Sequence, residues 1–308
     1  MKRLFIILSM AGSVLAVARP VTNMNGRSSK AYDNRAIMFA NTCSPASQSA
    51  DLDINNVRTK ILNGGDMWWD LNNPKYEVPK VTDPNAVRKH SLFSGAIWIG
   101  GKDNGGNLKL AAMTYRQRGS DFWPGPLDLS TTSTDPGRCE AYDKMWKVTR
   151  DELEAAEASN WTDISSSIRE WPAGKDRTIK SGNESDDMAP FFSPTGGIDY
   201  NPSQGDYPVL DNTRDPLDNG VDKQPDMFIW WVYNDKGNIH SETQGQAIGV
   251  ECQTTAFAFA TNDTDVREPL FTLHALEQHG KVGRMALRHH EHECMGGKAL
   301  NFHSWYLT

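Results

Sequence analysis

A hairpin signal between two hydrophobic runs constrains the fold of this chain more than any other feature. Residues 91–100 and 108–115 are the two runs, and residues 103–106 between them read Asp-Asn-Gly-Gly. Asn and Gly tolerate the positive φ angles that tight hairpin turns require. We therefore predict an antiparallel pair of strands here, with residues 103–106 at its turn.

A second pair of runs repeats this pattern further along the chain. Residues 227–233 are hydrophobic, residues 234–238 read Asn-Asp-Lys-Gly-Asn, and residues 246–259 return. Alternate residues of the returning run fall on opposite faces, which is the period of a strand. One face holds Gln253, Thr255, Phe257 and Phe259, and the other holds Thr254, Ala256 and Ala258. We predict a mainly β fold of antiparallel, sandwich-like sheets with long loops.

Residues 150–158 are the one segment that predicts a helix. Thr149 and Glu152 have the Thr-x-x-Glu spacing of a capping box, in which two otherwise unpaired amides of the first turn find partners. Leu153 and the alanines that follow it favour helix until Ser159. We predict one short helix near residues 150–158.

The N-terminus has the three parts of a secretory signal peptide. Lys2 and Arg3 precede an apolar run at residues 4–17, and residues 16–18 read Ala-Val-Ala, a small-x-small cleavage pattern. The run is too short to span a bilayer stably. We therefore predict a signal peptide at residues 1–18, export to the cell surface or the medium, and no stable membrane span after cleavage.

The rest of the chain divides by composition. Residues 19–50 are polar and rich in small residues, which predicts a flexible leader, and residues 51–265 form the β-rich secreted module. Inside that module, residues 159–224 are rich in Gly, Pro and Asp and show no periodicity. So long a loop region is either disordered or held by something else, such as a metal ion.

The net charge narrows the class of binding partner. A net charge of −7 argues against nucleic acid, because phosphate binding needs clustered Lys and Arg.

The cysteines bear on disulfides and metal sites. After export, four cysteines allow three disulfide pairings. None of them has Cys-x-x-Cys spacing, which argues against a zinc or thioredoxin-like site; they are Cys43, Cys139, Cys252 and Cys294.

Residues 266–308 form a tail of a different character. Six of the eight histidines lie there, and the strand alternation is lost. Residues 289–294 read His-His-Glu-His-Glu-Cys, which suits zinc or copper. A frameshifted or truncated gene product is the interpretation we prefer. DNA that encodes residues 277–296 can be translated in the next reading frame as NNMEKLEGWRYGITNMNVWG. That translation is rich in Trp, Gly and Asn, like the rest of the chain. We expect this tail to pack poorly against the preceding sheet and to leave residues 253–259 as a sheet edge.

Several aromatic and glycine-rich phrases resemble the N-terminal region of large secreted proteins of Bacteroidetes that are exported by the type IX secretion system. The matching phrases lie at residues 53–58, 64–70, 95–101, 114–116, 121–126 and 234–240, and the resemblance covers roughly residues 35–263. Such proteins look like long surface or extracellular chains, often with adhesin-like modules downstream. The resemblance implies location more firmly than activity.

Residues 199–206 are the candidate metal site. Asp199, Asn201 and Ser203 place oxygen side chains at alternate positions, and Gly205 and Asp206 follow. This is the start of a calcium loop, but Leu210 stands where an EF-hand has its Glu, so a complete EF-hand is excluded. A smaller calcium loop and a solvated Asp/Asn/Gly turn both fit the pattern.

Aromatic and acidic residues suggest a glycan partner. The pairs Trp68-Trp69 and Trp230-Trp231 either fill a core or offer stacking platforms for sugars. Neighbours in a strand point to opposite faces, so at most one of each pair joins a given platform. The carboxylates that a glycosidase would need are present but not paired by any motif; they include Asp66, Asp70, Glu77 and Asp121.

The function that follows is a non-enzymatic, exported surface or extracellular module, adhesin-like and calcium-stabilised at residues 199–206, with an extracellular glycan or surface partner. No motif marks a nucleophile. The alternative is a secreted carbohydrate-binding or carbohydrate-active protein that uses its Trp and Asp residues.

Overall fold

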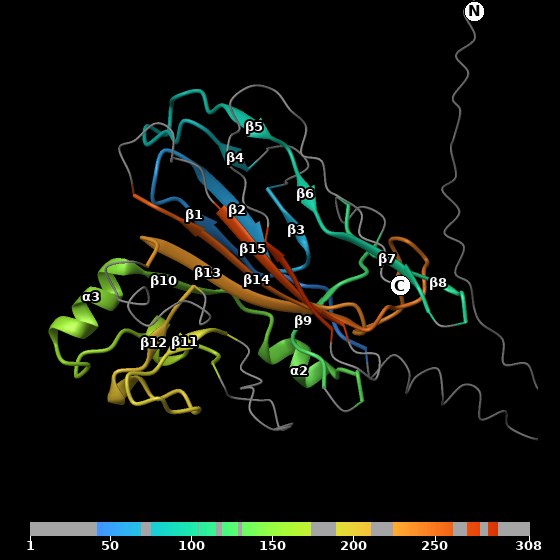
Figure 1. The fold of residues 1–308 in the computed structure, drawn as a ribbon. Helices are drawn as coiled ribbons and strands as arrows, with labels where there is room; N and C mark the ends of the chain where they lie inside the picture. The colour runs from blue at the N-terminus through green and yellow to red at the C-terminus, as the bar shows by residue number, and fades with distance from the viewer. Residues whose placement is uncertain are drawn as a thin grey trace, which may run out of the picture. The chain divides into compact units, whose positions relative to one another are not determined.

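The computed structural model describes residues 42–68, 75–103, 105–114, 119–128, 131–173, 189–210 and 224–260, together with the backbone of residues 270–277 and 283–288 (Figure 1). In this part of the chain the fold is mainly β, and every pairing between named strands is antiparallel, as the hairpin signals predict. No helix among these residues has the length and apolarity to cross a bilayer.

The central sheet is built on two long strands, β13 and β14. They pair residue by residue from Met227↔Ala258 to Asn234↔Glu251, which confirms the second predicted hairpin. The sheet order is β10-β13-β14-β15-β16, and the short β9 also pairs with the end of β13. The strands are β9 (Trp123–Pro124), β10 (Trp146–Thr149), β13 (Met227–Asn234), β14 (Val250–Ala258), β15 (Leu270–Glu277) and β16 (Gly283–Arg288).

A second sheet of short strands is formed by the N-terminal part of the module. Its order is β5-β4-β2-β3-β6, with β1 on β2. The strands are β1 (Ser49–Leu52), β2 (Arg58–Leu62), β3 (Asp66–Met67), β4 (Tyr76–Glu77), β5 (His90–Leu92) and β6 (Gly95–Ala96).

The first predicted hairpin is confirmed as a separate two-stranded sheet of β7 (Trp98–Lys102) and β8 (Leu108–Ala112). Its turn is closed by Asp103, whose carboxylate accepts hydrogen bonds from the backbone of Gly105 and Asn107. The run at residues 91–100 is not one strand, however. It is divided among β5, β6 and β7, which belong to two different sheets.

Both faces of the central sheet are buried. One face packs on the second sheet, where Trp231 and Tyr233 of β13 meet Leu52 and Ile61. The other face carries Trp230 in a separate core cluster. Trp230 and Trp231 point to opposite faces, as strand geometry requires, and both are buried because both faces are covered.

A third layer of helices and loops covers the outer face of the central sheet. Helix α3 (Arg150–Ala158) is the predicted helix, and Thr149 and Glu152 form both bonds of its capping box. Two further short helices were not predicted, α2 (Pro136–Ala141) and α4 (Ser166–Arg169). Each begins at a side-chain cap, Asp135 or Ser165, but is too short to show periodicity. The layer also contains β11 (Phe191–Phe192), the 3₁₀ helix η1 (Pro202–Gln204) and β12 (Tyr207–Pro208).

Aromatic packing holds the described part of the loop region 159–224. Trp161 stacks on Tyr207 with ring centroids 5.4 Å apart, and the Trp171 ring packs edge-on against Phe228 of β13. The indole N–H of Trp171 donates to the carbonyl of Pro190. The described loops are therefore neither a linker nor disordered, because buried rings fix them to the sheet.

The N-terminal segment 42–50 differs from the flexible leader predicted to reach residue 50. Cys43 and Ala46 are buried, and β1 begins at Ser49. Asp143 ties this segment down, because its carboxylate accepts hydrogen bonds from Ser47 and Asn63. The leader prediction is wrong for residues 42–50, and residues 19–41 lie outside the described part of the chain.

The beginning of the tail also differs from expectation. β15 pairs with β14 from Val250↔Glu277 to Phe257↔Leu270, and β16 pairs with β15. β14 is thus an interior strand, and the expectation that it would be a sheet edge is wrong. Strand-forming residues such as Phe271, Thr272 and Leu273 were present, but the histidines around them masked the alternation.

Two tryptophans offer a direct test of the three-layer packing. We expect Trp230→Ala to lower the free energy of unfolding by about 3–5 kcal/mol, because Trp230 is 1% exposed and fills one core. Trp98→Ala is the matched control, since Trp98 is 70% exposed, and should cost well under that amount. Urea unfolding curves measure both. Equal losses would contradict the layer assignment.

The anchoring of the N-terminal segment predicts a pH dependence. Partial burial acts to raise the pKa of Asp143, but hydrogen bonds from Asn63, Ser47 and Gln48 outweigh it and lower the pKa below its ordinary value of 3.8. A lowered carboxyl pKa stabilises the fold above the ordinary value, and this contribution disappears as the pH falls through the folded value. We expect Asp143→Asn to be less stable than wild type at pH 7, with the difference shrinking below about pH 4. A constant difference in unfolding midpoint from pH 7 to pH 2 would contradict this.

Candidate functional site

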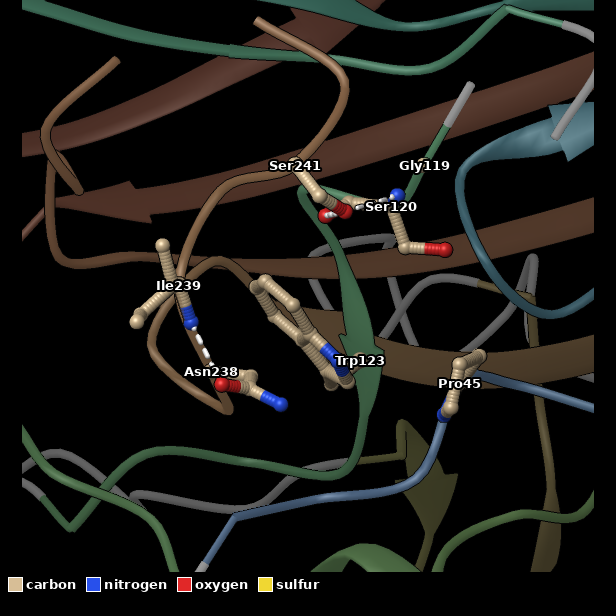
Figure 2. Close-up of a pocket in the computed structure, with 7 residues that line it drawn as sticks. All are labelled: Pro45, Gly119, Ser120, Trp123, Asn238, Ile239 and Ser241. Carbon is tan, nitrogen blue, oxygen red and sulfur yellow. Dashed lines mark hydrogen bonds between the residues drawn. The ribbon is translucent and has the colours of Figure 1, made fainter. Parts of the chain in front are cut away.

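The candidate site is a surface pocket where three distant segments meet (Figure 2). Its volume is about 310 Å³, near the lower end for small-ligand sites. The segments are the disulfide-linked N-terminal segment, the chain around β9 and the loop after β13. The lining residues are Pro45, Gly119, Ser120, Trp123, Asn238, Ile239 and Ser241.

Trp123 forms the aromatic wall of this pocket. It is 2% exposed and packs in one cluster with the disulfide of Cys43 and Cys139. Gly237 crosses close to the ring, because a Cβ atom there would lie 2.5 Å from Trp123. The Cys43 amide donates to the Gly237 carbonyl at 2.9 Å. The disulfide and this close approach together fix the ring against the loop after β13.

Polar groups line the opposite side of the pocket. The hydroxyl of Ser241 accepts from the Ser120 amide at 2.9 Å and donates to the Ser120 carbonyl at 3.2 Å. The side-chain oxygen of Asn238 accepts from the Ile239 amide, and Figure 2 shows its nitrogen turned away from that bond. Ile239 is 78% exposed at the rim. The pocket thus combines an aromatic ring, hydroxyls, an amide group and an apolar rim.

Three buried ionisable residues lie around the wall of the pocket. Asp121 accepts hydrogen bonds from the Ala112 and Glu242 amides and from Thr243. Asp235 accepts from the amides of residues 248–250. His240 lies between the two carboxylates. Burial raises the pKa of Asp235, while these amides and His240 act in the opposite direction.

The carboxylates considered for a glycosidase pair are engaged in the fold. Glu77 is buried, pairs with Arg58 and accepts from the Val81 amide. Asp121 holds the loop backbone as described above, and Asp66 is buried at 1% exposure. Asp70 lies outside the described residues. The described members of this set therefore face the interior.

The tryptophan pairs are core residues where they are described. Trp68, Trp230 and Trp231 are each at most 5% exposed, and Trp69 lies outside the described residues. Two other tryptophans were not singled out from the sequence, Trp98 on the exposed hairpin and Trp123 in the pocket. The only sequence signal for Trp123 was its position within one of the phrases that carry the family resemblance.

The candidate calcium residues lie around η1. Asn201 caps this short helix by accepting from the Ser203 amide, and Asp206 Oδ2 accepts from the Asn201 amide at 2.7 Å. Asp206 is 2% exposed, and its Oδ1 has no hydrogen-bond partner. Asp199, Asn201 and Ser203 are exposed. The structure thus links Asn201 to Ser203 and to Asp206.

In the part of the chain that the structure describes, no group of three or more His, Cys, Asp and Glu side chains is placed to share a metal ion. The histidine-rich stretch 289–294 lies outside that part. Of the four cysteines, Cys43 and Cys139 form a disulfide, and Cys252 is a buried free thiol whose pKa is raised by burial. Cys294 lies outside the described residues.

Comparison of this chain with models of protein families, with curated proteins and with solved structures found no match.

The disulfide predicts how the pocket responds to reduction. Cys43 and Cys139 close a loop with a sequence separation of 96, so replacing both with Ser should cost roughly 2–5 kcal/mol of stability. The same change should release Pro45 from the pocket. Thermal unfolding with and without a thiol reductant measures this: wild type should lose stability on reduction, and the double variant should not respond. A wild-type midpoint indifferent to reductant would contradict it.

Proposed function

We propose that this chain is a non-enzymatic, adhesin-like module that is exported to the cell surface or the extracellular space. We propose that it binds an extracellular glycan in the Trp123 pocket. The observation that carries the proposal is the composition of the pocket. The pocket presents the small exposed part of the Trp123 ring, which is 2% exposed, beside hydroxyl and amide groups. A sugar offers apolar C–H groups and hydroxyls that match this mixture. A glycan with one terminal residue inserted suits the small volume.

Two further features support an extracellular location. The disulfide of Cys43 and Cys139 suits an oxidising compartment, in which such bonds form and persist. The sequence of residues 1–18 independently has the pattern of a secretory signal. The proposed kinship with proteins of the type IX secretion system rests on the sequence phrases, two of which, residues 121–126 and 234–240, contribute to the pocket.

The state of the carboxylates favours binding over turnover. Glycoside hydrolysis needs two carboxyl groups placed on either side of the scissile bond. Asp121 follows the lining residue Ser120, but its oxygens accept hydrogen bonds from backbone amides and from Thr243. The carbohydrate-active alternative therefore needs catalytic groups other than Asp121.

A glycan array probed with the full exported chain tests the proposal, followed by titration calorimetry on each glycan that binds. We expect Ile239→Asp to weaken binding at least about tenfold, because it places a charge on the rim of the pocket. Ile198→Asp is the matched control, since Ile198 is also exposed, at 58%, and does not line the pocket.

Three outcomes would contradict the proposal. Absence of binding to every glycan would leave a purely structural role. Equal effects of Ile239→Asp and Ile198→Asp would place the binding site elsewhere. Release of reducing sugar from a bound glycan would support the carbohydrate-active alternative.

We also propose that calcium stabilises the loop at residues 199–206. The observation that favours a cation is the unpartnered Oδ1 of Asp206, because a buried carboxylate oxygen without a partner is costly. A bound ion would supply that partner and would stabilise the folded chain by mass action.

Thermal unfolding in millimolar calcium and in chelator tests this second proposal. We expect a higher midpoint in calcium for wild type and no calcium response for Asp206→Asn. Asp163→Asn, which changes an exposed carboxylate, should keep the wild-type response. Identical midpoints in calcium and chelator would leave the solvated-turn interpretation.

A further inference from the structure

His240 is a buried histidine whose two ring nitrogens both face hydrogen-bond acceptors. Nδ1 lies 2.7 Å from the Leu110 carbonyl oxygen, and Nε2 lies 2.7 Å from the Asp235 carbonyl oxygen. A carbonyl oxygen only accepts, whereas a neutral imidazole has one N–H and one bare nitrogen. A bare nitrogen 2.7 Å from a carbonyl would set two lone pairs against each other. Two N–H donors would satisfy both carbonyls, and only the doubly protonated ring has two.

The charges around the ring agree with this state. Asp121 Oδ2 lies 3.7 Å from Nδ1, and Asp235 Oδ2 lies 3.8 Å from Nε2. All the hydrogen bonds described for these two carboxylates come from N–H or O–H donors, so both carboxylates act as acceptors. A cation between the two carboxylates offsets part of their negative charge, whereas a neutral ring would offset none of it.

Groups from the neighbouring elements also face this cluster. Trp123 of β9 presents its ring, with centroids 5.9 Å apart, which suits a cation–π contact. β8 contributes only the Leu110 carbonyl. Cys252 of β14 faces Asp235, and burial raises the pKa of its thiol, so the thiol is uncharged. Glu242, on the same loop as His240, accepts from the Thr114 hydroxyl through Oε1, and its Oε2 is buried without a hydrogen-bond partner.

We propose that His240 is a buried imidazolium and the positioning residue of the Trp123 pocket. Its positive charge joins three segments: β8 through Leu110, the chain before β9 through Asp121, and the end of β13 through Asp235. Asn238, Ile239 and Ser241, which line the pocket, are held by this clamp. Only the consequence for ligand binding rests on the proposed function; the charge state and the clamp do not.

Nitrogen NMR of the full chain with ¹⁵N-labelled histidine tests the charge state. At pH 7.5 an unconstrained imidazole is mostly neutral. We expect both ring nitrogens of His240 to carry a hydrogen at that pH, and we expect the His240→Gln spectrum to assign the signals. The same chain unfolded in urea is the control and should show neutral rings. A bare nitrogen on folded His240 at pH 7.5 would overturn the proposal.

A double-mutant cycle tests the clamp. In His240→Gln the charge is removed, and in Asp121→Asn one counter-charge is removed. Amide hydrogen exchange at Ser241, whose N–H donates to the Ser120 carbonyl, should become about tenfold faster in each single variant. The double variant should exchange more slowly than the product of the two single effects predicts, because removing the charge of His240 and that of Asp121 together also removes their mutual interaction. Multiplicative effects would contradict charge coupling.

Binding by these variants separates the two proposals. If an array glycan binds, His240→Gln should weaken it without changing the lining residues. If no glycan binds, the proposed function fails, while NMR and exchange still decide the state of His240. If glycan binding by His240→Gln equals that of wild type, with faster exchange at Ser241, the role of His240 in positioning the pocket is refuted.

Discussion

The antiparallel pairing of β13 with β14, buried on both faces, is the constraint on which the rest of the structure depends. Every residue of both strands is buried, so each side chain must fit one of two cores. A slip of one residue in register would exchange the two faces and send Trp230 and Trp231 into each other's core. The other elements are placed by this pair: β10 and β9 bond to β13, and β15 bonds to β14.

The pocket inherits its geometry from the end of this strand pair. β13 ends at Asn234, whose amide group donates to the Gly125 carbonyl and so draws the chain after β9 against it. Asp235 follows at once, and its carboxylate binds the amides that lead into β14. The loop that carries Asn238 and Ser241 is thus fixed at both of its ends, because the register of β13 and β14 sets where it starts and where it finishes. Polar side chains position the site because the loop has few apolar residues with which to pack.

Strand pairing and the main helix could be predicted because their signals are local. The turn at residues 103–106, the alternation around Thr254 and the capping box at Thr149 each lie within a few residues of what they determine. The pocket could not be predicted, because Pro45, Trp123 and Ser241 meet only through tertiary contacts. The loop region 159–224 misled for a related reason: the residues that fix its described part, Trp161 and Trp171, have partners distant in sequence, Tyr207 and Phe228. The pairing of Cys43 with Cys139 was one of three that the sequence left open.

The buried charges beneath the pocket contribute more to its geometry than to stability. Taking ions out of water costs about as much as their attraction returns, so a trio of Asp121, His240 and Asp235 is a weak source of net stability compared with apolar packing. Hydrogen bonds to these groups are directional, however, and each carboxylate binds specific amides on a loop that has no regular structure. Apolar side chains at these positions would fill the space but would leave the same amides without partners. The hydrogen bonds of the trio therefore hold this loop in the conformation that sets Asn238 and Ser241 beside Trp123.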